Sequence, residues 1–307
     1  ECNGKTADQL AWHDGALLGL RGRAFNSTAT TYERLPATAQ AGAGPGGKGP
    51  VRSAIWSLQK QPAGLFLQFT TDAPCIFVRY NIASPGIAMW HFPSTGVAGM
   101  DLYAWDEGNS TWRWTGTSHP KYPQTQSKMA SFSCIHSACK PKSYRLHLPT
   151  YMATSNISIG VERTATIAPD SSHIGREKPI VWYGTSILQG GVASRPGQVN
   201  THIVSRALET EIYNFGFSGN GIMELSVAQY LTEIDCSMII VDCSHNMNAA
   251  LITQNTIPLV RYLRTNGHAS TPIVLAEGTP SGTDWSAASV NTTIQGPLSM
   301  ALDAAYN

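Results

Sequence analysis

The pattern of apolar and polar positions divides the chain into two halves near residue 170. Up to about residue 165 the two kinds of residue alternate, as they do in half-buried β-strands. In the segment 143–149, for example, Tyr144, Leu146 and Leu148 share one face, while Arg145 and His147 share the other. Similar strands are predicted at 64–71, 75–83, 100–105, 110–116 and 156–164. Many short strands without intervening helices predict an all-β sandwich or jelly-roll domain over residues 1–170.

After about residue 176, apolar strands alternate with helix-like stretches. Strands are predicted at 180–186, 211–218, 237–243 and 272–278, with helices at 200–210, 223–234 and 251–267. In the first helix, Ile203, Ala207 and Leu208 share one face, and the third helix ends at Gly267. The strand 237–243 is apolar enough to be central in a parallel sheet. This βαβ series predicts an α/β domain over residues 176–307.

The glycine-rich stretch 37–50 is predicted to be a flexible loop within the first domain, not a domain boundary.

Groups capable of chemistry follow the first three strands of the α/β half. They are the segments 184–186 (GTS), 214–221 (NFGFSGNG) and 242–247 (DCSHNM). In an open α/β sheet, active groups lie at the carboxyl ends of the strands. Taken singly these signals are weak, because a serine, a glycine pair or an asparagine after a strand is usually a turn or cap residue.

Together, and in this order, the three blocks resemble those of the SGNH (GDSL-type) hydrolases. The family's opening Gly-Asp-Ser stands here as Gly-Thr-Ser, ending at Ser186. Its Asn-x-Gly-x-x-Gly block matches Asn214, Gly216 and Gly219. Its third block, usually Gly-x-Asn-Asp, keeps Asn246 but neither the Gly nor the Asp. The resemblance implies a flavodoxin-like, three-layer SGNH domain over 176–307.

The first half supports the same resemblance. The segment 99–103 (GMDLY) resembles the Gly-x-Asp-Leu-Tyr signature of a β-sandwich domain that precedes some SGNH modules. The segments 34–36 (RLP), 89–96 (MWHFPSTG) and 112–116 (WRWTG) are similar to that domain's pattern as well. The resemblance therefore covers nearly the whole chain.

The resemblance also implies roles for individual residues. Ser186 would be the nucleophile, and its own N–H, the N–H of Gly219 and the side-chain amide of Asn246 would form the oxyanion hole. Asn214 is expected to brace the loop rather than touch substrate. His91 lies in a segment that resembles the rim of the family's active site, so it is a candidate substrate contact. The function implied is a serine esterase or acylhydrolase that removes acyl groups, such as acetyl, from carbohydrate.

A serine hydroxyl needs an adjacent base, which SGNH enzymes supply from an Asp-x-x-His block after the fifth strand and before the last helix. No such block follows the fourth strand here, and the last histidine, His268, precedes that strand. The domain is thus expected to be incomplete at its C-terminus. His245, beside Asn246, is a weaker candidate base, and His202 is expected to be a solvent or packing residue.

An incomplete domain would leave the fourth strand as an open sheet edge. Three explanations remain open: the chain continues, it was cleaved and the C-terminal piece stays bound, or the module is degenerate and a partner chain covers the edge. The chain also begins with Glu1 rather than Met, so a processed chain or a fragment is expected.

Composition and modification motifs predict an extracellular protein. Net charge is +1, which gives no electrostatic case for nucleic acid or an anionic membrane. Only 13% of residues are charged, about half of the usual share of roughly 25%, and four sequons favour secretion with glycosylation. These sequons begin at Asn26, Asn109, Asn156 and Asn291.

Six cysteines agree with that prediction. Cys134 with Cys139, and Cys2 with Cys75, are candidate disulfides; the alternative for each is a buried free thiol, which is favoured for Cys243. Cys236 and Cys243 are too far apart along one strand to bridge. No cofactor is indicated, and no zinc-type spacing indicates a metal site.

A second class of function stays open beside the esterase. The module is then catalytically inactive, and the protein is a glycosylated structural or carbohydrate-binding protein. Trp90, Trp105, Trp112 and Trp114 would suit a carbohydrate surface, although filling the core is the plainer expectation for most of them.

Overall fold

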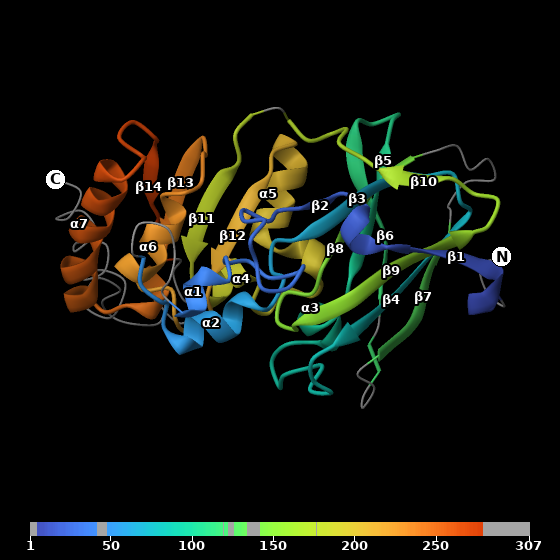
Figure 1. The fold of residues 1–307 in the computed structure, drawn as a ribbon, viewed down its shortest axis with the longest axis horizontal. Helices are drawn as coiled ribbons and strands as arrows, with labels where there is room; N and C mark the ends of the chain where they lie inside the picture. Colours follow the sequence, from blue (N-terminus) through green and yellow to red (C-terminus); the bar gives the residue numbers. More distant parts are fainter. Residues whose placement is uncertain are drawn as a thin grey trace, which may run out of the picture.

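The computed structural model describes residues 5–41, 48–118, 120–121, 126–133, 142–175 and 177–278. Three sheets make up these residues: two antiparallel sheets from the first half and one parallel sheet from the second (Figure 1). Along the long axis of the molecule, the parallel strands run in the order β14, β13, β11 and β12, and the antiparallel sheets follow beyond β12 (Figure 1). The first half therefore lies beside the β12 edge of the parallel sheet.

The first antiparallel sheet has the strand order β1-β9-β4-β7. Its strands are β1 (Leu10–Asp14), β4 (Cys75–Ile82), β7 (Gln126–Ser133) and β9 (Thr154–Glu162). The second has the order β10-β3-β8-β5-β6, with β2 beside β3. Its strands are β2 (Leu20–Arg21), β3 (Phe66–Thr71), β5 (Asp101–Asp106), β6 (Thr111–Thr117), β8 (Lys142–His147) and β10 (Ile167–Pro169).

Alternation of side chains explains why these strands form. One apolar cluster takes side chains from both antiparallel sheets, such as Leu67 and Leu146 from one sheet and Val78 and Ile159 from the other. The six predicted strands of the first half are confirmed within a few residues, and β1, β2, β7 and β10 were missed. The sandwich or jelly-roll arrangement of the two sheets stays a prediction.

The parallel sheet has the order β12-β11-β13-β14, which is that of the first four strands of a flavodoxin-like sheet. Its strands are β11 (Ile180–Gly184), β12 (Ile212–Gly216), β13 (Met238–Asp242) and β14 (Ile273–Leu275). The predicted central position of 237–243 is confirmed, because β13 lies between β11 and β14. Within the described residues, β14 is an edge strand, and its Val274 is 42% exposed.

Helices connect and cover the strands. The α-helices are α1 (Thr38–Ala41), α2 (Ser53–Gln59), α3 (Ser94–Val97), α4 (Ser186–Gln189), α5 (Asn200–Leu208), α6 (Leu225–Leu231) and α7 (Ala249–Thr265). Four short 3₁₀ segments are η1 (Ala7–Gln9), η2 (Gly15–Leu17), η3 (Pro196–Gln198) and η4 (Ser244–Asn246). None of these helices has the length and apolar character that crossing a membrane requires.

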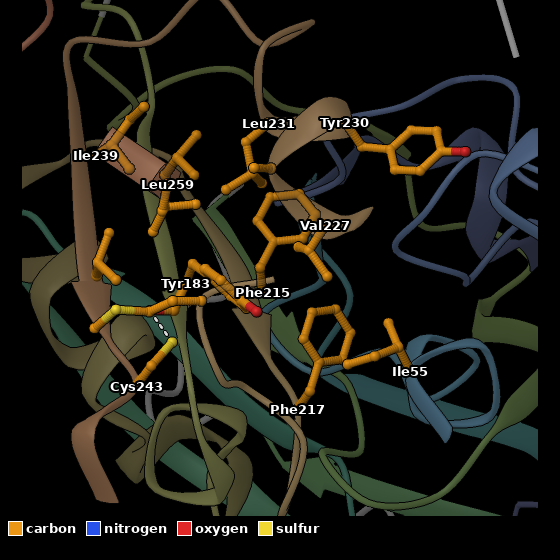
Figure 2. Close-up of a cluster of buried hydrophobic side chains, with 14 of the residues drawn as sticks. Ile55, Tyr183, Phe215, Phe217, Val227, Tyr230, Leu231, Ile239, Cys243 and Leu259 are labelled. Atoms are coloured by element: carbon orange, nitrogen blue, oxygen red, sulfur yellow. Dashed lines mark hydrogen bonds between the residues drawn. The ribbon is translucent and has the colours of Figure 1, made fainter. Parts of the chain in front are cut away.

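One face of the parallel sheet packs against a large apolar cluster (Figure 2). Val181, Tyr183 and Ile239 point into it from the strands, and Val227 and Leu259 meet them from α6 and α7. This cluster also takes side chains from the first half: Figure 2 shows Ile55 of α2 beside Phe217. Residues between Phe25 and Trp56 therefore help to cover the α/β sheet, although they precede most of the antiparallel strands. The domain limits at 170 and 176 stay predictions.

One local expectation was wrong, and one helix has an orientation that was not predicted. Part of the stretch 37–50 is not a loop, because Thr38–Ala41 form α1 and Ala39 is buried in the cluster; residues 42–47 lie outside the described residues. In α5 the apolar face is turned outward: Ile203 is 43% exposed and Leu208 is 59% exposed. The buried face carries Thr201, His202 and Ser205 instead, because α5 packs against polar side chains of the second antiparallel sheet.

Candidate active site

Three neighbouring strand ends bring the sequence-predicted residues to one edge of the parallel sheet. In the strand register, Gly184 of β11 lies opposite Gly216 of β12 and Asp242 of β13. Ser186, Gly219 and Asn246 follow these three strand ends directly. The site thus forms where adjacent parallel strands terminate together, as expected for an open α/β sheet.

Ser186 is the first residue of α4 and is partly exposed. Thr185 caps this helix, since its side chain accepts a hydrogen bond from the Ile187 N–H at 3.3 Å. A threonine here performs the capping that an aspartate would perform, which accounts locally for Gly-Thr-Ser in place of Gly-Asp-Ser. Neither the N–H nor the Oγ of Ser186 has a hydrogen-bond partner within the described residues. Both groups are therefore available to a ligand.

The strand ends approach each other too closely for side chains. A Cβ on Gly216 would lie 2.2 Å from the Gln189 nitrogen, and one on Gly221 would lie 2.0 Å from the Gly184 oxygen. Gly219 differs, because its Cβ would meet nothing, but its φ of +67° is in the left-handed region that favours glycine. The N–H of Gly219 has no acceptor within the described residues. That N–H is a second donor available beside Ser186.

Asn246 ends the short η4 segment and faces the turn at residues 217–221. Its amide is satisfied best when its oxygen accepts from the N–H groups of Asn220 at 3.1 Å and Gly221 at 3.2 Å. The opposite orientation offers only long contacts from the amide nitrogen to carbonyls, at 3.4 and 3.5 Å. The favoured orientation turns the amide nitrogen away from these two N–H groups.

Asn214 braces the site, as the sequence predicts. It is buried, and its amide nitrogen donates to the Leu188 carbonyl at 2.7 Å and to Thr201 Oγ1 at 3.1 Å. Its amide oxygen accepts from the Gly216 N–H at 2.8 Å. One side chain therefore ties β12 to α4 and α5.

Arg34 is a supporting residue that sequence reasoning missed. Its buried guanidinium donates to the carbonyls of Gly216 at 2.7 Å, Leu58 at 2.8 Å and Asn214 at 3.1 Å, and it lies over the Phe217 ring. Burial lowers the pKa of Arg34 to about 9. The only signal in the sequence was its place in the RLP segment, and that segment did not show what the guanidinium would contact.

Residues of the first half also hold the loop that follows Ser186. The Tyr151 hydroxyl donates to the Ser186 carbonyl at 3.1 Å, and the Tyr151 ring packs edge-on against Phe92. Gln189 joins the two halves, because its side chain donates to the Thr150 carbonyl at 3.1 Å and accepts from the Ser218 N–H at 2.9 Å. These contacts position the nucleophile segment from outside the α/β sheet.

The described histidines lie around the site in different ways. His91 is exposed and its ring lies 4.4 Å from that of Trp90, beside the Phe92 that packs on Tyr151. His202 is buried against Phe66 and His147, so its packing role is confirmed. His268 is buried and faces the Leu231 carbonyl at 3.1 Å.

His245 is exposed and precedes Asn246. Burial raises the pKa of Asp242, and the charge of the nearby His245 opposes that rise. Because Ser186 Oγ has no partner within the described residues, none of the described histidines hydrogen-bonds to it. The structure places the predicted nucleophile and the predicted oxyanion-hole residues at adjacent strand ends, and no base hydrogen-bonded to Ser186 is found among the described residues.

The structure describes three of the four predicted glycosylation sites and three of the six cysteines. Asn26, Asn109 and Asn156 are exposed, whereas Asn291 lies outside the described residues. Cys236 and Cys243 are buried free thiols, which confirms the preference stated for Cys243. Cys2, Cys134 and Cys139 lie outside the described residues, so the two disulfide pairings stay predictions. In the described part of the chain, no three or more His, Cys, Asp or Glu residues form a group that would hold a metal ion.

Comparison with known proteins adds two family matches. Residues 10–167 match the GxDLY domain, the N-terminal part of SGNH-hydrolase-type esterases, and residues 177–301 match the GDSL-like lipase/acylhydrolase family. No curated protein matches the chain.

Two solved structures share the fold over almost the whole chain. A protein described as a GDSL-like lipase from Bacteroides ovatus superposes with a TM-score of 0.83 at 26% identity, covering 97% of this chain and 81% of that one. The salicylyl-acyltransferase SsfX3 from a tetracycline biosynthetic pathway superposes with a TM-score of 0.71 at 17% identity, covering 98% and 81%. At that identity the second match shows the fold alone.

Proposed function

The chain belongs to the SGNH-hydrolase-type esterases that begin with a GxDLY domain, and from that premise we propose that it hydrolyses acyl esters with Ser186 as the nucleophile. One observation carries the proposal. Ser186 presents an unengaged Oγ and N–H at the end of β11, and the unengaged Gly219 N–H and the Asn246 amide follow the two neighbouring strand ends. A nucleophile flanked by donors of this kind is what acyl transfer requires.

The reaction divides into two displacements at one carbonyl carbon. Ser186 Oγ attacks the ester carbonyl and loses its proton to a base, and the negative charge that develops on the carbonyl oxygen is stabilised by the three donors. Collapse of this intermediate releases the alcohol, which takes up the proton, and leaves an acyl group on Ser186. Water then attacks the acyl-enzyme, and the same donors stabilise the second oxyanion until the acid is released.

The base is the part of this mechanism that the described residues do not place beside Ser186. We propose that it is a histidine from outside these residues, contributed by a C-terminal piece or by a partner chain at the β14 edge. His245 is the competing candidate, because it lies near Asp242 at the end of the neighbouring strand. Intact-mass analysis of the native protein, together with the activity of His245→Ala, separates the two: an active His245→Ala variant rules out His245.

For the substrate, we propose an acylated carbohydrate, such as an acetylated polysaccharide, met outside the cell. Trp90 supports this proposal, because it is 96% exposed and lies in the segment whose Phe92 packs against Tyr151, the residue whose hydroxyl donates to the Ser186 carbonyl. An exposed indole beside His91 offers a flat apolar surface of the kind that sugar rings cover. The three exposed sequons are accessible to a glycosylating pathway, which supports secretion.

The decisive experiment compares two site variants with a serine control. Ser186→Ala is expected to abolish hydrolysis of p-nitrophenyl acetate and labelling by a fluorophosphonate probe. Asn246→Ala is expected to lower kcat by about 10²–10³-fold with little change in the unfolding midpoint. Ser237→Ala is the matched control, since this exposed serine lies at the opposite end of β13 and contacts the Pro179 carbonyl.

The results also test the alternative of a catalytically inactive carbohydrate-binding or structural protein. If the native protein neither hydrolyses esters nor reacts with the probe at Ser186, the esterase proposal fails and the inactive alternative stands. If Asn246→Ala keeps full turnover, Asn246 is not part of the oxyanion hole.

A further inference from the structure

A pocket of about 350 Å³ lies between the two halves of the chain, apart from the strand ends that carry Ser186. Its walls come from three segments: α3, the end of β6, and the loop that precedes η3. The lining residues are Thr95, Trp114, Gly116, Thr117, Ser194 and Arg195. No part of the proposed hydrolytic mechanism uses these residues.

One buried carboxylate sets the geometry of this pocket. Asp101 is fully buried, and its Oδ1 accepts from Trp114 Nε1 at 2.7 Å and from Thr117 Oγ1 at 2.7 Å. Its Oδ2 accepts from the Gly197 N–H at 3.0 Å and forms an ion pair with Arg195 Nε at 3.0 Å. Asp101 therefore fixes three of the six lining residues and joins the two halves at the same point.

The groups that line the pocket combine an aromatic surface with polar atoms. Trp114 is 50% exposed, and the Arg195 guanidinium lies 4.8 Å from the centre of its ring. Arg195 Nη1 has no partner within the described residues, so it can donate into the pocket. Thr95 Oγ1 donates to the Ser194 carbonyl at 2.6 Å and keeps its lone pairs as acceptors.

The charge of the pocket indicates a neutral ligand. Among the lining residues, the positive charge of Arg195 is offset by Asp101 in direct contact, so the lining carries no uncompensated charge of its own that would attract a phosphate or carboxylate. A sugar ring suits both the aromatic surface and the polar atoms of the pocket, because its C–H face packs on an aromatic ring and its hydroxyl groups donate and accept hydrogen bonds. The volume lies within the usual range of ligand pockets.

The pocket is linked to the Ser186 segment through short contacts. Ser194 and Arg195 follow α4 in the chain, and a Cβ on Gly96 of α3 would lie 2.1 Å from the Ala193 oxygen. The Gly96 carbonyl accepts from Thr150 Oγ1, next to the Tyr151 whose hydroxyl donates to Ser186. The pocket and the Ser186 segment are therefore parts of one packed body.

We propose that this pocket binds a neutral sugar residue of the ester substrate, separate from the residue that carries the acyl group. The proposal rests on the proposed function in taking carbohydrate as the substrate class. The GxDLY domain then has a direct part in substrate recognition, through Trp114 and through the Arg195 that Asp101 holds.

Binding is measured first, without turnover. Calorimetry on the full Ser186→Ala chain with neutral hexasaccharides of β-1,4-linked xylose, glucose or mannose is expected to detect binding of at least one. Adding Trp114→Ala to this chain is expected to raise the Kd for the hexasaccharide about tenfold, because a packed aromatic contact is lost. Arg113→Ala is the matched control, because this exposed neighbour in β6 forms an ion pair with Asp106 instead.

A second variant guards against a local unfolding effect of Trp114→Ala. Ser194→Phe fills the pocket without removing any of the contacts to Asp101, and it is expected to weaken hexasaccharide binding to a similar degree. In the active enzyme, both variants are expected to raise KM for an acetylated oligosaccharide about tenfold. Neither is expected to change kcat/KM for p-nitrophenyl acetate, which is too small to reach both regions.

The outcomes test sugar binding by the pocket independently of ester hydrolysis at Ser186. Hexasaccharide binding that Trp114→Ala and Ser194→Phe both weaken supports the pocket, even if no ester is hydrolysed, in which case only the proposed esterase fails. Absence of binding by all three hexasaccharides, binding that neither variant changes, or binding of uronic-acid oligosaccharides alone would each overturn the proposal.

Discussion

Two regions of the molecule are buried in opposite ways: one face of the parallel sheet, and the contact between α5 and the second antiparallel sheet. One face packs against an apolar cluster built from α2, α6, α7 and the strands, including Val241, Leu259 and Leu263 (Figure 2). In the second region, α5 turns Thr201, His202 and Ser205 inward and leaves its apolar residues exposed. Thr201 contacts Asn214 of β12, and His202 packs against His147 of β8. The first region is thus closed by apolar packing and the second largely by polar side chains.

The polar side has an unusual composition. The rings of His147 and His202 lie 4.0 Å apart, and Arg206 Nη1 is 3.0 Å from His147 Nε2. An arginine can only donate, so His147 Nε2 must accept and the ring must be neutral. His147 Nδ1 and His202 Nε2 are buried without hydrogen-bond partners within the described residues. The stability of this polar region therefore requires the rings of His147 and His202 to be uncharged.

Burial alone does not indicate how much a residue stabilises the folded protein. An apolar side chain gains from leaving water, whereas an unpartnered polar atom loses its hydrogen bonds to water. Substitutions on the apolar side should therefore lower the free energy of unfolding at any pH. Those on the polar side should mainly change how the free energy of unfolding depends on pH. Three measurements test this difference.

The largest effect is expected on the apolar side. Leu259→Ala removes a fully buried side chain of α7 and should lower the free energy of unfolding by about 2–5 kcal/mol, as other buried leucines do. Urea unfolding followed by circular dichroism measures the loss. Leu17→Ala is the control, because Leu17 is 75% exposed and its removal should change the free energy by less than about 0.5 kcal/mol. Equal losses in the two variants would contradict the comparison.

The next effect is acid sensitivity of the polar side. Burial, with the nearby arginines, lowers the pKa of His147 and of His202 well below 6.5 in the folded protein. The unfolded chain therefore binds more protons below pH 6.5, and stability should fall with the pH from there toward the folded pKa values. The expected loss is about 1 kcal/mol for each histidine over the first pH unit below 6.5.

Unfolding free energies between pH 7.5 and 5.5 test this expectation. In the His202→Leu variant, the slope of the unfolding free energy against pH should be smaller than in the unmodified chain, by the contribution of about one proton. A pH dependence that is the same in both proteins would show that His202 is not held neutral by burial.

The smallest effect is expected for the same variant at pH 7.5. His202→Leu removes a ring nitrogen that has no partner and keeps an apolar side chain against Phe66. Its free energy of unfolding should change by less than about 1.5 kcal/mol, because no satisfied hydrogen bond is lost. Thermal melting at that pH measures the shift. A loss as large as that of Leu259→Ala would show that the histidine makes a contact of real stabilising value.

The strand ends of the α/β half were predictable from the sequence alone. Apolar runs placed β11, β12 and β13 within a few residues, and the motifs that follow them placed Ser186, Gly219 and Asn246 at adjacent strand ends. This succeeded because parallel central strands are apolar on both faces and end in glycines wherever backbones come close together.

The supports of the site were not predictable in the same way. Arg34 lies 180 residues before Asn214, whose carbonyl it binds, and no local pattern links the two. Tyr151 and Gln189 likewise join segments that are distant in the chain. The orientation of α5 was not predicted, because periodicity shows which residues share a face but not which face meets the protein.

The sequence by itself determined the order of strands and helices in the second half, the three motif blocks and the family. Local periodicity and short motifs are properties of short segments and can be read from them. Only the tertiary structure decided that residues 25–56 cover the α/β sheet and that Arg34 binds the end of β12. It also decided that Asp101 fixes Trp114 and Arg195 around one pocket. These are contacts between distant segments, and they form only when the sheets and helices pack together.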